Sequence, residues 1–197
     1  MEIWIGTTNK GKLSEMKMVL EKEVPEISIK SLTDMPNYSQ PPENGKTFEE
    51  NARIKAKSMK AVKPGAWVLA EDTGLVVDAL GGLPGIHTAR YAGPHARDSE
   101  NIAKLLKMIQ IKSTGNRAAK FVCVMIAYDP QGNEHIFATA LHGEIAKTPI
   151  GLMGFGYDPI FIPEGETKTL AELGPAYKNK NSHRALATRE LIKVIQS

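Results

Sequence analysis

Isoleucines recur at every second position in two short stretches near the start of the chain. Glu2 to Thr7 and Ile27 to Leu32 each have the pattern of a short strand. Between them, four apolar residues recur at helical spacing: Leu13, Met16, Val19 and Leu20. The order strand, helix, strand is typical of an α/β protein.

A polar segment with three prolines, residues 33–46, predicts a loop. The helix predicted after it runs from Thr47 to Val62, and Thr47 and Glu50 stand at the spacing of a capping box. Asn51 and Lys55 are four residues apart and share a face of this helix that differs from its apolar face. A lysine on a helix is most often a solvated charge.

Two adjacent acids interrupt an apolar stretch that begins at Val68. The stretch predicts a buried strand whose end carries Glu71 and Asp72, and Gly74 permits a sharp change of direction there. Consecutive strand side chains point to opposite faces, so the two acids cannot both face one cleft. Buried acids need a paired cation or a metal. Two interpretations are open: Asp72 serves a Mg²⁺-dependent phosphate site, or both acids lie in an exposed turn.

The second half of the chain has a clear hairpin pattern. Two long runs, Arg117 to Tyr128 and Glu134 to Ala146, flank a turn rich in Asp, Pro, Gly and Asn. A helix is expected from about Asp98, and a final helix follows a polar, basic loop at residues 177–184. Together with the early alternation, this pattern predicts an α/β fold with a mixed sheet.

Composition limits the class of protein. The chain has 197 residues, 42% of them hydrophobic, and a net charge of +3. This length fits one domain or one two-lobed domain, and so mild a charge gives no argument for nucleic acid or an anionic membrane. Cys123, the only cysteine, is expected to be a buried thiol. No apolar run is long enough to span a bilayer, so cytoplasmic residence is the default expectation.

The segment from Thr7 to Lys12 lies between a predicted strand and a predicted helix. The N–H groups of a first helical turn and the helix dipole attract anions, and Lys12 adds an ammonium. This is not a Walker A loop, because the Gly-x-x-x-x-Gly-Lys-Ser/Thr spacing is absent. An ordinary connection capped by Asn9 explains the same residues.

Glycines flank an aromatic residue between positions 151 and 156. Phe155 either stacks on a flat ring such as a nucleobase or covers the core, and its residue type alone favours the second. Asp158 is suited to bind a hydroxyl, a base edge or a nearby lysine. His183 and Arg184 are expected in the first turn of the final helix, where cations oppose the helix dipole. They therefore face an anion or a base edge, or they are solvated.

A series of motifs, taken in chain order, resembles the inosine triphosphate pyrophosphatase family of house-cleaning enzymes. They are Thr7-Thr8-Asn9-Lys10-Gly11-Lys12, Gly45-Lys46-Thr47-Phe48-Glu49-Glu50-Asn51-Ala52, Glu71-Asp72-Thr73-Gly74-Leu75, Gly81-Gly82-Leu83-Pro84-Gly85, Ala89-Arg90-Tyr91, Phe155-Gly156-Tyr157-Asp158-Pro159 and Ser182-His183-Arg184. The motifs cover nearly the whole chain and are specific in combination. Two departures stand out: Thr8 replaces a frequent glycine, and Glu71 and Thr73 replace a common Asp and Ser.

The resemblance implies a fold, a reaction and partners. The family fold is an elongated mixed β-sheet with flanking helices that form two lobes around a central cleft, so residues 1–197 are expected to form one such domain. The reaction is Mg²⁺-dependent hydrolysis of ITP, dITP and XTP to the monophosphate and pyrophosphate. The expected partner is a purine nucleoside triphosphate, without nucleic acid or membrane, and family members are typically homodimers.

The resemblance also implies roles for single residues. Asp72 resembles the general base and metal-linked acid, and Glu43 resembles a second metal carboxylate. Eight residues of this chain resemble those with which the family contacts the triphosphate: Thr7, Thr8, Asn9, Lys10, Gly11, Lys12, Lys55 and Thr73. Seven residues resemble those that form the family's base and sugar pocket: Phe155, Gly156, Tyr157, Asp158, Lys178, His183 and Arg184.

Two other functions are open. One is a pyrophosphatase for a pyrimidine or another modified triphosphate, which a panel of triphosphates would separate. The other is a non-catalytic nucleotide-binding or nucleic-acid-binding module, which would bind without Mg²⁺ and without turnover. Scattered basic residues and few aromatic ones weigh against the second.

Overall fold

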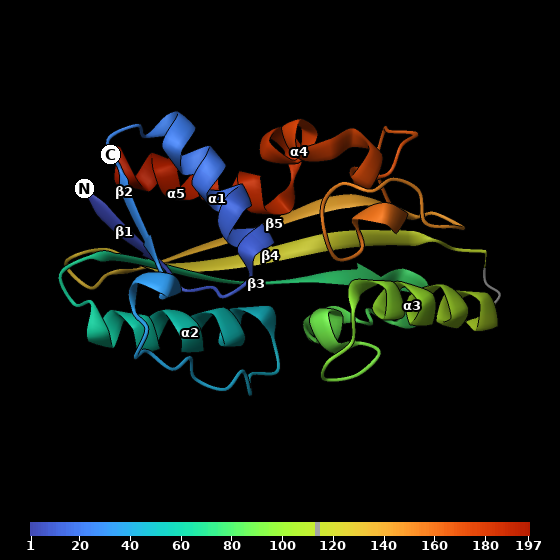
Figure 1. The fold of residues 1–197 in the computed structure, drawn as a ribbon, viewed down its shortest axis with the longest axis horizontal. Coiled ribbons are helices and arrows are strands. Elements are labelled where there is room, and N and C mark those ends of the chain that lie inside the picture. Colours follow the sequence, from blue (N-terminus) through green and yellow to red (C-terminus); the bar gives the residue numbers. More distant parts are fainter. Residues whose placement is uncertain (113–114) are drawn as a thin grey trace. The chain divides into compact units, whose positions relative to one another are not determined.

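The computed structural model describes residues 1–112 and 115–197, and Figure 1 shows their fold. The strands in these residues are β1 (Glu2–Ile5), β2 (Ser28–Ser31), β3 (Trp67–Val77), β4 (Ala118–Tyr128), β5 (Glu134–Ile145) and β6 (Phe161–Pro163). The α-helices are α1 (Lys10–Glu23), α2 (Phe48–Val62), α3 (Asp98–Lys112), α4 (Leu170–Asn181) and α5 (His183–Ile195). None of these described helices has the length and hydropathy that crossing a membrane requires.

The strands form one mixed sheet in the order β2-β1-β3-β4-β5-β6. β1 pairs in parallel with both β2 and β3, whereas β5 and β6 are antiparallel. The predicted α/β class with a mixed sheet is confirmed. Parallel pairing early in the chain follows from the helices α1 and α2, which carry the chain back between successive strands.

The chain divides into two compact units. The first comprises Met1–Asp72, Cys123–Thr139 and Arg184–Ser197, and the second comprises Thr73–Val122 and Ala140–His183. The chain therefore leaves the first unit directly after the two adjacent acids on β3. The single domain with a cleft between two lobes stays a prediction.

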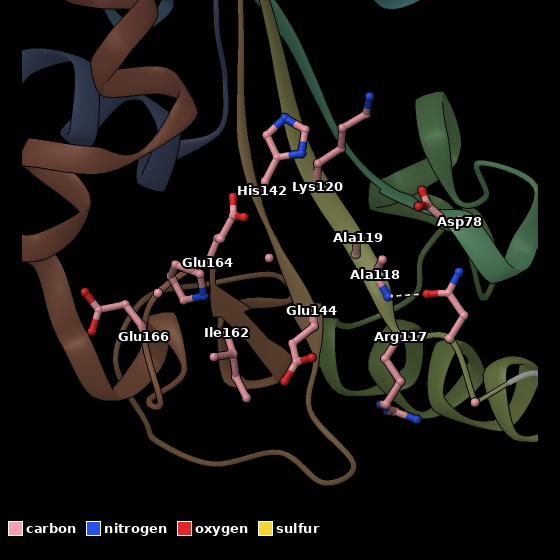
Figure 2. A pocket seen from close by; sticks show the side chains of 15 residues that line it. Asp78, Arg117, Ala118, Ala119, Lys120, His142, Glu144, Ile162, Glu164 and Glu166 are labelled. Carbon is pink, nitrogen blue, oxygen red and sulfur yellow. Dashed lines mark hydrogen bonds between the residues drawn. The ribbon is translucent and has the colours of Figure 1, made fainter.

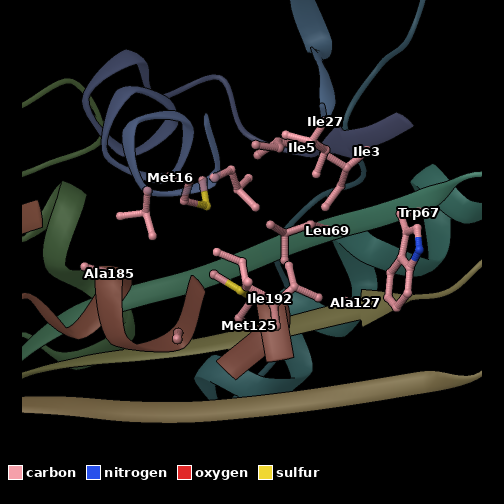
Figure 3. Packing of buried hydrophobic residues seen from close by; sticks show 14 of the residues in the cluster. Ile3, Ile5, Met16, Ile27, Trp67, Leu69, Met125, Ala127, Ala185 and Ile192 are labelled. Atoms are coloured by element: carbon pink, nitrogen blue, oxygen red, sulfur yellow. The ribbon is translucent and has the colours of Figure 1, made fainter. Parts of the chain in front are cut away.

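Helices cover both faces of the sheet in the first unit. α1 and α5 pack on one face, where Met16 and Ile192 join a buried cluster with Leu69 (Figure 3). α2 packs on the other face, where Ala56 shares a buried cluster with Ala70. Leu69 and Ala70 are neighbours on β3, so successive residues of this strand face opposite helix layers, as its period of two requires.

Polar side chains fix where α1 and α2 begin. Asn9 Oδ1 accepts a hydrogen bond from the Lys12 N–H at 3.0 Å, and Thr47 Oγ1 accepts one from the Glu50 N–H at 3.1 Å. Caps of this kind contribute about 1 kcal/mol each. The Glu50 carboxylate accepts from the Lys46 N–H at 2.6 Å and not from the Thr47 N–H, so only the Thr47 half of the predicted capping box forms.

The turn between β4 and β5 confirms the predicted hairpin. Asp129 Oδ1 accepts from the Asn133 N–H at 2.8 Å, and Oδ2 accepts from the Asn133 side-chain amide at 2.8 Å and lies 3.3 Å from His135 Nε2. Burial alone would raise the pKa of Asp129, but the hydrogen bonds from Asn133, His135 and Gly132 outweigh it and lower the pKa to about 2.

The core of the second unit is built around two aromatic rings that meet at a tilt of 51°. Phe121 on β4 lies 4.7 Å, centroid to centroid, from Phe161, and Leu105 of α3 belongs to the same buried cluster. The predicted start of α3 at Asp98 is confirmed. This cluster supports the loops and helix that carry the expected base-binding residues.

Two local predictions were wrong. Gly74 lies inside β3 and does not turn the chain, because the strand continues to Val77. Residues 177–181, expected in a loop, form the end of α4, and the backbone bends earlier, at Gly174, whose φ is 75°. Thr169 caps α4 through the Glu172 N–H at 3.3 Å. A helix with a kink therefore replaces the expected loop.

Candidate active site

The two acids on β3 are buried and face opposite sides of the strand. Glu71 and Asp72 are 2% and 7% exposed, which rules out an exposed turn. Glu71 follows Leu69 on the side of α1 and α5, and Asp72 follows Ala70 on the side of α2. Each acid therefore has its own set of partners, which we call the Glu71 cluster and the Asp72 cluster.

The Asp72 cluster consists of Glu43, Asn51, Lys55 and Asp72. Lys55 Nζ lies 2.8 Å from Glu43 Oε1 and 3.7 Å from Asp72 Oδ1. The Asn51 side-chain amide donates to Asp72 Oδ2 at 3.2 Å. Asn51 and Lys55 are themselves buried, at 0% and 7% exposure. The face that they were predicted to share thus points at Asp72, and the lysine is not a solvated charge.

Burial and neighbouring charge set the protonation of this cluster. Burial raises the pKa of Asp72, and Lys55 and Lys12 only partly oppose the rise. Burial would lower the pKa of Lys55, but the attraction of Glu71, Asp72 and Glu43 outweighs it, so the pKa is raised. The lysine therefore stays charged at neutral pH. The carboxyl becomes a stronger base than an exposed aspartate, as general base catalysis requires.

The Glu71 cluster consists of Lys12, Glu15, Glu71 and Arg184. Lys12 Nζ lies 2.9 Å from Glu71 Oε1, and Arg184 Nε lies 4.0 Å from Glu71 Oε2. The Arg184 guanidinium also forms an ion pair with Glu15 of α1. Arg184 is only 2% exposed. It therefore enters a buried ion network in the first unit, and the solvated alternative is wrong.

The start of α1 retains the features of an anion site. The Asn9 side chain caps the Lys12 N–H, so the ordinary capping interpretation is confirmed. Thr7 Oγ1 in turn accepts from the Asn9 N–H at 3.2 Å. Lys10 and Gly11 occupy the first two helical positions, whose N–H groups have no carbonyl partner within a helix. Thr8 and Lys10 are exposed at the same end. Capping and anion binding are therefore compatible here.

In the second unit, Asp158, Lys178 and Phe155 form a compact group, the Asp158 cluster. Asp158 Oδ2 accepts from Lys178 Nζ at 2.6 Å and from the Phe155 N–H at 2.9 Å. The same ammonium lies 4.5 Å from the centroid of the Phe155 ring, a cation–π distance. Asp158 and Lys178 are 3% and 5% exposed, and Phe155 is half-buried. Of the partners considered for Asp158, the structure shows the lysine.

The other predicted residues of the second unit have structural partners. The Tyr157 hydroxyl donates to the Thr88 carbonyl at 2.9 Å, and the Gly156 N–H donates to Asp98 Oδ2 at 2.6 Å. The His183 ring stacks on Phe121 at 5.0 Å with an interplanar angle of 8°. Thr73, half-buried, follows directly after Asp72 on β3. Roles of these residues in substrate binding stay predictions.

The Asp72 cluster fits a magnesium ion that shares its ligands with a substrate. Two carboxylates, Glu43 and Asp72, contact the same ammonium, Lys55 Nζ, at 2.8 and 3.7 Å. Among residues 1–112 and 115–197, no group of three or more His, Cys, Asp or Glu side chains is arranged to hold a metal. Mg²⁺ commonly takes one or two carboxylates plus phosphate oxygens, so this pair is a suitable protein contribution.

A separate cavity of about 630 Å³ lies in the second unit. Figure 2 shows its lining from β4, β5, β6 and the segment after β6. Its ionised side chains are mixed in sign: Asp78, Glu144, Glu164, Glu166, Arg117 and Lys120. No residue predicted to bind substrate or metal is among the residues that line it. The excess of carboxylates makes this cavity unsuited to a polyanion.

Sequence reasoning missed Asn51 as a partner of Asp72, and Glu15 as a partner of Arg184. The i, i+4 spacing of Asn51 and Lys55 was the available signal, because it places both on one helix face. No comparable signal links Glu15 to Arg184, since the two are far apart in the chain and meet only through the packing of α1 and α5.

The chain is similar to known proteins over its whole length. A model of the Ham1 family matches residues 3–194. A dITP/XTP pyrophosphatase of Bdellovibrio bacteriovorus is 56% identical over 197 residues, which cover 100% of this chain and 98% of the relative. A dITP/XTP pyrophosphatase of Mycobacteroides abscessus is 41% identical over 199 residues, with 100% and 96% coverage.

Solved structures agree with these relatives. A HAM1 protein from Coxiella burnetii superposes with a TM-score of 0.88 at 38% identity, covering 100% of this chain and 98% of that one. The Ham1 protein of Staphylococcus aureus superposes with a TM-score of 0.85, also at 38% identity and with the same coverage.

Proposed function

This chain belongs to the Ham1 family, and we propose that it hydrolyses dITP, ITP and XTP to the monophosphate and pyrophosphate with the help of Mg²⁺. The family resemblance drawn from the motifs is confirmed. Relatives named dITP/XTP pyrophosphatase support the choice of purine base and of reaction. The homodimer expected for this family is part of the same proposal.

The balance of charge around β3 supports the proposed need for a metal ion. The Asp72 and Glu71 clusters hold four carboxylates and three cations: Glu15, Glu43, Glu71, Asp72, Lys12, Lys55 and Arg184. A triphosphate carries about four negative charges near neutral pH, so carboxylates in excess would repel it. Glu43 and Asp72 would hold a divalent cation, which would supply the positive charge that the phosphates need.

The proposed reaction uses Asp72 as the general base. Its pKa is raised by burial, so its carboxylate accepts a proton from an attacking water more readily than an exposed aspartate would. The water attacks the α-phosphorus, and pyrophosphate leaves. Lys12, Lys55 and the start of α1 bind phosphate oxygens. Glu43 and Asp72 would hold Mg²⁺, which would supply charge neutralisation and polarisation of the water.

Replacing Asp72 with Asn tests this assignment. The substitution keeps the shape but removes the base, so pyrophosphate release from dITP should fall at least about a hundredfold. Asp78→Asn is the matched control, because Asp78 is an exposed acid just after the same strand. Near-normal turnover in Asp72→Asn, measured with saturating Mg²⁺, would remove Asp72 from the mechanism. In the same assay, the wild-type enzyme should lose all turnover when a chelator removes the metal, which tests the metal dependence.

For base selection we propose Lys178, which is a donor-only group. A 6-oxo purine presents an acceptor, whereas the 6-amino group of adenine presents donors. Lys178→Met should therefore lower kcat/KM for dITP about 10-fold or more and leave the low rate with dATP nearly unchanged, since a hydrogen bond from a charged donor contributes about 1.5–3 kcal/mol. An unchanged dITP/dATP ratio in a variant that melts as a folded protein would contradict this role.

A further inference from the structure

Asn51 is the only residue of the Asp72 cluster in the described chain whose side chain is neutral, and it is fully buried. Its amide nitrogen donates to Asp72 Oδ2 at 3.2 Å, and its Oδ1 accepts from the Gly45 N–H at 2.9 Å. One side chain therefore connects the acid on β3 with the loop that carries Glu43. Buried amides are stable only when both ends find such partners.

The partners themselves fix the orientation of the amide. The Gly45 N–H can only donate, and an ionised carboxylate can only accept. If the amide were flipped, Asn51 would present NH₂ to the Gly45 N–H and its carbonyl oxygen to Asp72, and both contacts would be repulsive. The orientation in the structure satisfies both hydrogen bonds, so Asn51 is a fixed donor toward Asp72.

Space around Gly45 shows that this connection is tightly built. A Cβ added at Gly45 would lie 2.7 Å from Asn51 Oδ1 and 2.8 Å from Glu50 Cβ. Contacts under 3.0 Å are not tolerated without a shift of the neighbours, so the close approach of the loop to Asn51 depends on glycine. The loop is thus held against the start of α2 by the same side chain that contacts Asp72.

We propose that Asn51 is a positioning residue for the reaction, which anchors Asp72 Oδ2 and so directs Oδ1 toward Lys55. The proposal rests on the role of Asp72 proposed above. The amide is well suited to this task. A neutral donor holds one carboxylate oxygen without adding charge, whereas a second lysine or arginine would place a like charge beside Lys55.

Asn51→Asp tests the donor specifically. The introduced carboxylate still accepts from the Gly45 N–H, but it replaces the donor to Asp72 by a like charge. We expect kcat for dITP at pH 8 to fall about 10–100-fold, the usual effect of altering a residue that orients a ligand, with KM changed less than about 3-fold.

Asn101→Asp is the matched control. Asn101 is also buried, at 2% exposure, and also bridges two groups, accepting from the Ala92 N–H at 2.7 Å and donating to the Ala89 carbonyl at 3.2 Å. It lies in the second unit and contacts no member of the Asp72 cluster. The same substitution there should lower the melting temperature but leave kcat for dITP unchanged.

Three outcomes decide the proposal. A wild-type kcat at pH 8 in folded Asn51→Asp overturns it, and so does a rise in KM for dITP that exceeds the fall in kcat. If Asn51→Asp melts below the assay temperature, Asn51→Ser replaces it: this variant adds no charge and cannot span the gap to Asp72, so full kcat overturns the proposal. Asp72→Asn measured in parallel separates the two ideas, because normal turnover there would mean that Asp72 is not the base.

Discussion

Removing the ammonium of Lys55 should destabilise the protein through the carboxylates that it leaves behind. In Lys55→Met, Glu43 and Asp72 lose the cation that lies 2.8 and 3.7 Å from them. Breaking a buried ion pair on one side costs about 3–5 kcal/mol. The Glu43 side chain is 35% exposed, so water recovers part of this energy. We therefore expect a loss of about 2–3 kcal/mol at pH 8, or about 5–10 °C in Tm for a chain of this length.

The pH dependence of this loss follows from the signs of the pKa shifts. The pKa of Lys55 is raised in the folded protein, so its stabilising charge is fully present below the ordinary lysine pKa and is lost only as pH rises through the higher folded value. The loss in Lys55→Met should therefore be constant from pH 7 to 9. The pKa of Asp72 is raised as well, so toward pH 5 protonation of Asp72 relieves the repulsion in the variant and the loss should shrink.

Urea unfolding in chelator, at pH 5 and pH 8, measures these differences. Lys57→Met is the matched control, because Lys57 lies on the same helix and is exposed. Added Mg²⁺ should stabilise Lys55→Met more than wild type, since a bound cation replaces the missing ammonium. A variant as stable as wild type within about 0.5 kcal/mol at pH 8, the range of ordinary surface substitutions, would refute the account of Lys55 as the group that holds the two acids together.

Two further predictions concern stability and loop geometry. Asp129→Asn should lower the free energy of unfolding at pH 7 by about 1–2 kcal/mol. Because the folded pKa of Asp129 is about 2, this difference between variant and wild type should fade as pH drops from 4 toward 2. Urea unfolding across that range measures it, and a difference that persists at pH 2 would contradict the prediction. Gly154→Ala places a Cβ against Asp158 Oδ2 at a backbone φ of +83°, so KM for dITP should rise at least several-fold while Asp72-dependent chemistry is kept; an unchanged KM in steady-state assays would show that the Asp158 cluster does not bind substrate.

The pattern of the chain was sufficient to predict the elements around β3, but not their contacts. Helical spacing placed Asn51 and Lys55 on one face, and strand alternation separated Glu71 from Asp72. Which side chain meets which acid depends on how α2 packs on the sheet, and the small residues at its interface, Ala52 and Ala56, decide that distance. Spacing within one element carries no information about that packing.

The wrong local predictions share a physical cause. Gly74 has little preference for strand, and residues 177–181 have the composition of a loop. Tertiary partners overrode both tendencies. β3 continues through Gly74 with Leu75 and Val77 in the core of the second unit, and the end of α4 is held where Lys178 meets Asp158. A lysine that looks solvent-directed in the sequence gains a buried acid only through the fold.

Arg184 illustrates the limit for charged residues. Its position in the first turn of α5 opposes the helix dipole, and the sequence could offer only an external anion as compensation. The structure supplies Glu15 and Glu71 from α1 and β3. An internal carboxylate or an external phosphate would compensate equally for the unfavourable interaction of the Arg184 charge with the helix dipole. Only the packing of the three elements shows which of the two is present.

Strand β3 presents neighbouring acids to two different helix layers, and this has a consequence for how the protein can change. An insertion or deletion of one residue before Glu71 would exchange the layers that the two carboxylates serve, so that each would meet cations placed for the other. Length changes in this strand should therefore be rejected during evolution even where every side chain is preserved, whereas the hairpin turn at residues 129–133 should accept them.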